Sequence, residues 1–169
     1  MSAGSGTIRA AVPSDCGAVA AIYNEAIDDG QSTLETRARA ASDVEPWLDA
    51  PGRKLLVADA DGAIAGWARL SPYSPRPCYA GVAEAAVYVR TAARRNGLGG
   101  ALARGLQQWA HQTGHHKVVG KLLLQNEASR RLAARHGFRE VGVHLRHGQL
   151  RGVWHDVLVV ELLLGSAAD

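Results

Sequence analysis

The stretch from residue 87 to residue 102 reads V-Y-V-R-T-A-A-R-R-N-G-L-G-G-A-L, in which two adjacent arginines and three glycines separate a strand-like run from a helix-like one. The first turn of a helix carries unpaired N–H groups and a partial positive charge, which together bind anions. Glycines let the backbone approach a ligand closely, and Arg94 and Arg95 add forked donors that suit phosphate. The stretch therefore predicts a loop that holds a pyrophosphate, with an ordinary glycine-rich turn as the alternative.

Two common phosphate-binding patterns do not fit this loop. The nucleoside triphosphate loop requires a lysine after its second glycine, and no lysine lies here. Gly97 and Gly99 match the dinucleotide fingerprint, but Leu102 stands where its third glycine belongs. The seven histidines lack the spacing to carboxylates or thiolates that a zinc or iron site needs, so we expect no metal.

The bulk composition is that of an ordinary globular protein. The chain has 169 residues, of which 47% are hydrophobic and 21% charged, enough for one domain with a real core. Nineteen basic against sixteen acidic residues is too weak a bias to indicate nucleic-acid binding. No apolar run approaches the roughly 20 residues that span a bilayer, no signal peptide is visible, and there are only two cysteines. We expect a cytoplasmic protein without a nucleic-acid or membrane partner.

Hydrophobic periodicity predicts alternating strands and helices around one core. Strands are expected at 8–12, 54–59, 64–70, 82–90, 117–124, 138–145 and 153–163, and helices at 15–29, 40–48, 98–113 and 128–136. A polar insert at 147–152 should separate the last two strands, and Trp67, Trp109 and Trp154 should be core residues. This order predicts a single α+β domain at 7–164 with a mixed sheet flanked by helices, and flexible termini at 1–6 and 165–169.

The loop also resembles a known family. Arg94-Arg95-Asn96-Gly97-Leu98-Gly99 matches the [Gln/Arg]-x-x-Gly-x-[Gly/Ala] signature of the Gcn5-related N-acetyltransferases (GNAT). Further short matches resemble the phosphinothricin N-acetyltransferase branch of that family: I-Y-N at 22–24, T-L-E at 33–35, G-W-A at 66–68, R-P-C-Y at 76–79, E-A-A-V-Y-V at 84–89 and W-H-D-V at 154–157. The resemblance covers residues 7–164. It implies a mostly antiparallel central sheet, acetyl-CoA as co-substrate and a homodimer.

The resemblance also implies roles for individual residues in acetyl transfer from a thioester to an amine. Glu84 aligns with the glutamate that takes the amine's proton, although an exposed strand glutamate is the alternative reading. Backbone groups of Val87, Tyr88 and Val89 would pair with the pantetheine arm and stabilise the negative carbonyl oxygen. Asn126, with Ser129, would bind the same arm or cap the following helix. The implied pyrophosphate ligands are Arg94, Arg95, Asn96, Gly97, Leu98, Gly99 and Gly100.

The acceptor side departs from the branch. Arg76, Tyr79 and Glu35 are the implied substrate-binding residues, but Ser74 stands where the branch carries a second arginine, a charge that Arg151 would restore. Ala133 replaces a usual histidine, and His136 lies three positions later, nearly one helical turn. We expect the acceptor to be a small amino-acid-like amine of the phosphinothricin or methionine sulfone type. The alternatives are a polyamine, an aminoglycoside, a protein N-terminus, or a non-catalytic acyl-CoA-binding module.

Overall fold

Seven strands form one mixed sheet in the computed structural model, which describes residues 6–48 and 50–168. The strands are β1 (Thr7–Ala10), β2 (Lys54–Ala60), β3 (Ala63–Pro72), β4 (Val82–Val89), β5 (Lys117–Leu123), β6 (Arg139–Leu150) and β7 (Val153–Leu163). Their order across the sheet is β1-β2-β3-β4-β5-β7-β6, and only β4 and β5 pair in parallel. The expected α+β class with a mostly antiparallel sheet is confirmed.

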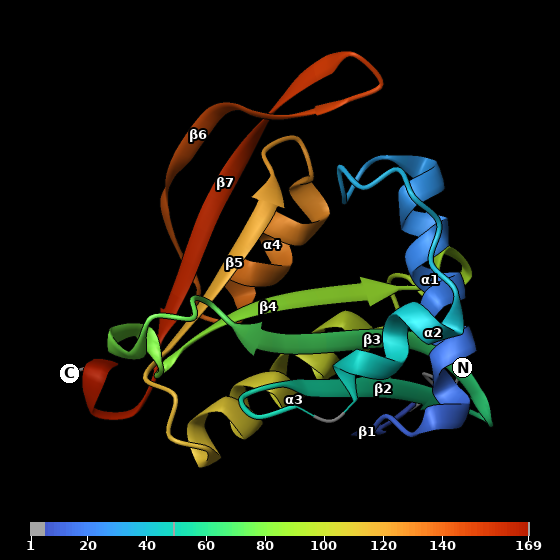
Figure 1. The fold of residues 1–169 in the computed structure, drawn as a ribbon, viewed down its shortest axis with the longest axis horizontal. Coiled ribbons are helices and arrows are strands. Elements are labelled where there is room, and N and C mark those ends of the chain that lie inside the picture. The colour runs from blue at the N-terminus through green and yellow to red at the C-terminus, as the bar shows by residue number, and fades with distance from the viewer. Residues whose placement is uncertain (1–5, 49, 169) are drawn as a thin grey trace.

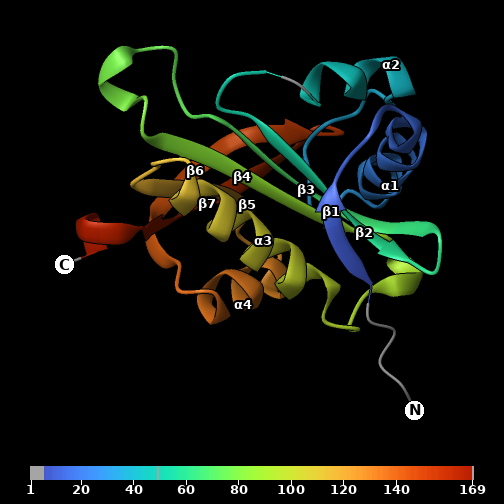
Figure 2. The same ribbon diagram turned by 90° about the horizontal axis from the view of Figure 1, so that it is seen from below.

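Helices cover both faces of the sheet. They are α1 (Cys16–Asp29), α2 (Ala41–Val44), α3 (Leu98–Gln112) and α4 (Glu127–Arg135). One face carries α1 and α2, and the opposite face carries α3 and α4 (Figures 1 and 2). Among the helices of the described residues, none is both long and apolar enough to span a bilayer.

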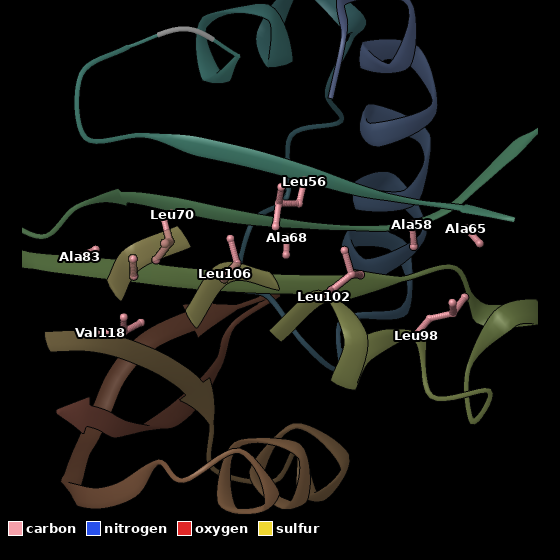
Figure 3. Packing of buried hydrophobic residues seen from close by; sticks show 11 residues of the cluster. Leu56, Ala58, Ala65, Ala68, Leu70, Ala83, Leu98, Leu102, Leu106 and Val118 are labelled. Carbon is pink, nitrogen blue, oxygen red and sulfur yellow. The ribbon is translucent and has the colours of Figure 1, made fainter. Parts of the chain in front are cut away.

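The alternation of side chains along the central strands builds a separate core on each face. On β2, Val57 packs with the α1 side, whereas its neighbour Leu56 packs with the α3 side. The α3 core receives Leu102 and Leu106, which lie one helical turn apart and face β2 and β3 (Figure 3). Each fully buried leucine contributes about 1.5–3 kcal/mol of transfer free energy, so α3 is held firmly against the sheet. This anchoring fixes the position of the loop that precedes α3.

The C-terminal hairpin differs from the sequence prediction. Strand β6 runs to Leu150, so the prediction of a polar insert at 147–152 is wrong for residues 147–150. Only Arg151 and Gly152 form a turn between the two strands. Both turn residues have positive φ, 48° and 82°, as a tight two-residue hairpin requires. Trp154 was expected in the core but is 56% exposed. The physical reason is that β6 and β7 extend past the helices as a two-stranded ribbon, so apolar alternation is not needed (Figure 1).

Smaller differences lie at element ends. The helix expected at 40–48 is α-helical only at Ala41–Val44 and continues as a 3-10 turn at Glu45–Trp47, where Pro46 lacks an N–H donor. The chain end expected to be flexible contains a 3-10 turn at Gly165–Ala168. The same expectation for residues 1–5 and 169 lies outside the described residues.

Candidate active site

The central strands diverge at the middle of the sheet. β4 and β5 pair only where Val82–Ala85 meets Lys117–Gly120, although both strands continue further. Beyond this point they form an open V (Figure 1). The β5-facing edge of β4 from Ala86 onward therefore has no strand partner among the described residues. Unpaired backbone groups need a hydrogen-bonding partner, so this edge can receive an extended ligand that carries amide groups.

A cavity of about 240 Å³ fills the space between the diverging strands, and we call it the strand-gap cavity. Its walls come from both strands of the V and from the facing sides of α3 and α4. The residues that β4, β5 and α4 contribute are Glu84, Ala85, Ala86, Val87, Tyr88, Val118, Gly120, Lys121, Leu122, Ser129, Leu132 and Ala133, and His136 adds to the wall just after α4.

Glu84 lies in the wall of the strand-gap cavity with one cationic partner. Lys121 Nζ donates a 2.9 Å hydrogen bond to Glu84 Oε2, and the two side chains are 45% and 34% exposed, respectively. No described residue donates to the other carboxylate oxygen, Oε1. The carboxylate is thus oriented by Lys121 and retains a free oxygen that can accept a proton from an amine in the cavity.

The loop before α3 has the geometry of an anion site. Arg95 and Gly97 both have positive φ, 68° and 80°, and Gly97 is the N-cap of α3. The first hydrogen bond of the helix runs from Ala101 N to Gly97 O, so the N–H groups of residues 98–100 have no acceptor within the helix. A Cβ at Gly100 would lie 3.0 Å from His136 Nε2, so the backbone at Gly100 passes close to this imidazole, which lines the strand-gap cavity.

The side chains of this loop are not equivalent. Arg94 donates to Val89 O at 3.2 Å and to Asp29 Oδ2 at 3.3 Å, so its guanidinium already ties the loop to β4 and α1. Arg95 and Asn96 are exposed, and no described residue forms an ion pair with Arg95. The Leu98 side chain is buried in the α3 core, which leaves only its main chain for a ligand.

Asn126 caps a helix at the edge of the site. Its Oδ1 accepts a 3.0 Å hydrogen bond from the backbone N–H of Ser129, and Asn126 is the N-cap of α4. The capping alternative is therefore confirmed for its oxygen. Ser129 lines the strand-gap cavity, whereas Asn126 does not.

Ala133 and His136 mark a departure of this sequence from the branch, and the structure shows where both residues lie. Both line the strand-gap cavity, so His136 faces the same space as Ala133, the position at which the resemblance leads us to expect a histidine. Burial lowers the pKa of His136 from its ordinary value, and the nearby Arg104 charge adds to this effect. The imidazole is therefore mainly neutral at pH 7.

A second cavity of about 350 Å³ lies on the face covered by α1 and α2, and we call it the helix-face cavity. It is lined by Tyr23, Glu35, Arg37, Arg39, Asp43, Trp47, Trp67, Arg69, Ala86 and Tyr88. Four of these residues, Tyr23, Arg69, Ala86 and Tyr88, also line the strand-gap cavity. The two cavities therefore share a wall, and burial raises the pKa of the Tyr88 phenol, which keeps its hydroxyl neutral. Two reactants, one in each cavity, would meet beside β4.

The residues expected to bind the acceptor are dispersed. Glu35 lines the helix-face cavity, where its Oε2 accepts a 2.9 Å hydrogen bond from the Arg39 guanidinium. Arg76 and Tyr79 are exposed in the loop between β3 and β4, with the guanidinium 5.7 Å from the Tyr79 ring centre, and neither residue lines either cavity. Arg151 donates to Asp28 O at 3.4 Å and also lies outside both cavities.

Sequence reasoning missed Arg69, which lines both cavities. One signal was present, because a charged residue interrupts the apolar run of β3 directly between Ala68 and Leu70. Its meaning depends on Trp47, a residue far away in the chain, over which the guanidinium lies. Among the described residues, no group of three or more histidines, cysteines or carboxylates could hold a metal ion.

Comparison with known proteins identifies the same family that the sequence motifs resemble. Residues 19–138 match the acetyltransferase (GNAT) family. The chain is 33% identical to phosphinothricin N-acetyltransferase of Streptomyces coelicolor, over 89% of this chain and 91% of that protein. It is 32% identical to the L-methionine sulfoximine/L-methionine sulfone acetyltransferase of Pseudomonas paraeruginosa, over 95% of both chains.

Two solved structures are similar throughout. Ribosomal-protein-alanine N-acetyltransferase from Brucella melitensis has a TM-score of 0.90 at 30% identity, covering 94% of this chain and 99% of that one. A phosphinothricin acetyltransferase from Sinorhizobium meliloti, solved in complex with acetyl-CoA, has a TM-score of 0.89 at 26% identity, covering 95% of this chain and 89% of that one. The family match, the relatives and the open strand gap lead to one conclusion: the chain belongs to the GNAT acetyltransferase family, in the branch similar to phosphinothricin and methionine sulfoximine acetyltransferases.

Proposed function

We propose that the protein transfers the acetyl group of acetyl-CoA directly to the amine of a small amino-acid-like substrate of the phosphinothricin or methionine sulfone type. The observation that carries this proposal is the shared wall of the two cavities, with Glu84 beside it. Because both reactants can be held at once, transfer needs no acetylated enzyme residue.

The site is built to receive acetyl-CoA. The free N–H groups of residues 98–100 and the exposed Arg95 suit a pyrophosphate, and the unpaired edge of β4 suits the amides of a pantetheine arm. Ser129, in the cavity wall, would add a hydroxyl for the same arm, and the remaining Nδ2 of Asn126 an amide donor. Bound acetyl-CoA supplies an activated thioester carbonyl.

The protein's own groups then act on the amine and on the developing charge. Glu84 Oε1 takes the proton that an ammonium must lose before it can attack, and Lys121 holds the carboxylate in place. The amine nitrogen bonds to the thioester carbonyl carbon, and a backbone N–H of β4 near Tyr88 or Val89 stabilises the negative carbonyl oxygen. The C–S bond then breaks, and the CoA thiolate leaves with the second amine proton as the free thiol. These steps require the amine to reach β4 from the helix-face cavity, which Ala86 of β4 lines.

A panel of amines tests the acceptor class. We expect kcat/KM, measured by release of CoA thiol, to be at least about tenfold higher with methionine sulfone or phosphinothricin than with spermidine or a short peptide. The reason is that the site should bind a compact acceptor with an acidic group more favourably. A preference for the peptide would instead favour a protein acceptor, in line with the name ribosomal-protein-alanine N-acetyltransferase that the Brucella melitensis structure carries. Binding of acetyl-CoA without turnover of any amine would indicate a non-catalytic binding module.

We also propose that the β6–β7 ribbon joins two copies of the chain. The ribbon exposes large apolar side chains, including Leu145 at 76%, Val153 at 59% and Trp154 at 56%, and β6 is an edge strand. Sedimentation should therefore give a particle of twice the 17.9 kDa chain mass, and Leu145→Glu should shift it toward the single chain. A wild-type protein that sediments as one chain at micromolar concentration would contradict this proposal.

A further inference from the structure

Arg69 lies in the central part of the sheet, where it lines both cavities. It lies on β3 directly opposite Ala86 of β4, with its side chain on the face that α1 and α2 cover. Its guanidinium lies over the Trp47 indole, 4.3 Å from the ring centroid. This packing holds the side chain in one orientation and gives the planar group an apolar support.

The positive charge of Arg69 has no ion-pair partner among the residues that the structure describes. Three guanidinium groups and two carboxylates line the helix-face cavity, and two of the guanidinium groups are matched: Arg37 with Asp43 and Arg39 with Glu35, each at 2.9 Å. No carboxylate of the described residues forms an ion pair with Arg69. Burial lowers its pKa from the ordinary value, which reflects the cost of desolvating the charge. An anion from outside the chain would complete the charge of the cavity.

Two further donors, on residues that line the same cavity, lack acceptors among the described residues. The Trp67 side chain is 1% exposed, and its Nε1 finds no hydrogen-bond acceptor among the described residues. The same holds for the buried Nε of Arg39. Buried donors without partners are uncommon and costly in folded proteins. A ligand with several acceptor oxygens and a negative charge, namely a carboxylate or phosphinate, would satisfy all three groups.

The location of Arg69 relative to Glu84 suits an acceptor with its acid close to its amine. Glu84 and Tyr88 flank Ala86 on the face to which Arg69 belongs, so Arg69 and Glu84 are diagonal cross-strand neighbours, a relation in which residues lie about 7–8 Å apart and their Cβ atoms somewhat closer. Ala86 contributes only a methyl group to the space between them. An acid held at Arg69 therefore places a neighbouring amine at the entrance to the strand gap, within reach of Glu84.

We propose that Arg69, assisted by Trp67 Nε1 and Arg39, binds the acidic group of the acceptor and makes the enzyme selective for amines that carry such a group. The inference rests on the proposed function and names the residue that sets its substrate class. It differs from the expectation from sequence resemblance, which gave this role to Arg76, a residue outside both cavities.

The test compares methionine sulfone with its uncharged carboxamide in the wild-type enzyme and in Arg69→Met. Methionine has a similar reach but no charge, so kcat/KM for methionine sulfone should fall about a hundredfold, mainly through KM, because a charge-assisted pair is lost. The carboxamide should change by less than about threefold. Arg69→Lys should retain part of the preference for the acid, since it keeps the charge but loses the fork.

Arg76→Met is the matched control and should retain the wild-type preference. A preference for methionine sulfone that survives in Arg69→Met, or that disappears in Arg76→Met instead, would overturn the inference while leaving the proposed function intact. If wild-type enzyme acetylates neither phosphinothricin nor methionine sulfone, the proposed function itself fails. The Kd for acetyl-CoA, measured by calorimetry, should stay within about threefold of the wild-type value in all three variants. If Arg69→Met no longer binds acetyl-CoA, the comparison of Arg69→Lys with the wild type tests the inference instead.

Discussion

Replacing Glu84 by glutamine is expected to lower kcat by about a hundredfold to ten-thousandfold, the usual contribution of a positioned general base. Glutamine keeps the size of the side chain and can still accept a hydrogen bond from Lys121 through its amide oxygen, so the wall of the strand-gap cavity stays in place. Only the ability to take a proton is removed. The Kd for acetyl-CoA should therefore stay within about twofold, and this separates a catalytic role from a structural one.

The pH profile makes this prediction sharper. Without a base, the Glu84→Gln enzyme can use only the fraction of acceptor that is already deprotonated, and this fraction rises tenfold per pH unit below the pKa of the amine. The rate of the variant should therefore climb steeply with pH and approach that of the wild type at high pH. Glu140→Gln removes an exposed carboxylate on β6 that pairs with Arg130 and lies outside both cavities, so it should leave the rate unchanged. Turnover by Glu84→Gln close to that of the wild type at pH 7 would remove Glu84 from the mechanism.

The elements that a short stretch of chain can specify were predictable from sequence. The loop before α3 needs a positive φ at its N-cap, and Gly97 supplies it; the helix needs an apolar stripe, and Leu102 and Leu106 supply it. Each requirement is met within a few residues of the place where it acts. The open V between β4 and β5 is different, because it depends on where two strands far apart in the chain stop pairing after Gly120.

Arg69 and the β6–β7 ribbon show why other features of the structure could not be predicted from the sequence. Arg69 gains its meaning from Trp47 above it and from Ala86 on the next strand, neither of which is near it in sequence. In the ribbon, His147 and Gln149 look like loop residues because solvent reaches both faces of the hairpin and no apolar alternation is required. Sequence patterns report burial, so they indicate core strands well and protruding strands poorly.

Asn96→Asp is expected to stabilise the free protein while weakening its hold on acetyl-CoA. Asn96 is exposed immediately before Gly97, the N-cap of α3. A negative charge there interacts favourably with the helix dipole, by about 0.3–1 kcal/mol, and should raise the melting temperature slightly. The same charge competes with the pyrophosphate for the N–H groups of residues 98–100. Repulsion of about 1–3 kcal/mol near a protein surface corresponds to roughly a tenfold to hundredfold rise in Kd.

Gln112→Glu makes the same change in net charge at the opposite end of α3, about 20 Å away along the helix. It should lower stability, because a negative charge at a helix C-terminus is unfavourable, and leave the Kd for acetyl-CoA unchanged. Raising the salt concentration should narrow the gap between Asn96→Asp and the wild type, since the residue is exposed and its charge is screened. Calorimetry at low salt decides the matter: equal affinity in Asn96→Asp and the wild type would mean that the pyrophosphate binds elsewhere, because a charge beside the free N–H groups of α3 cannot be neutral toward an anion bound to them.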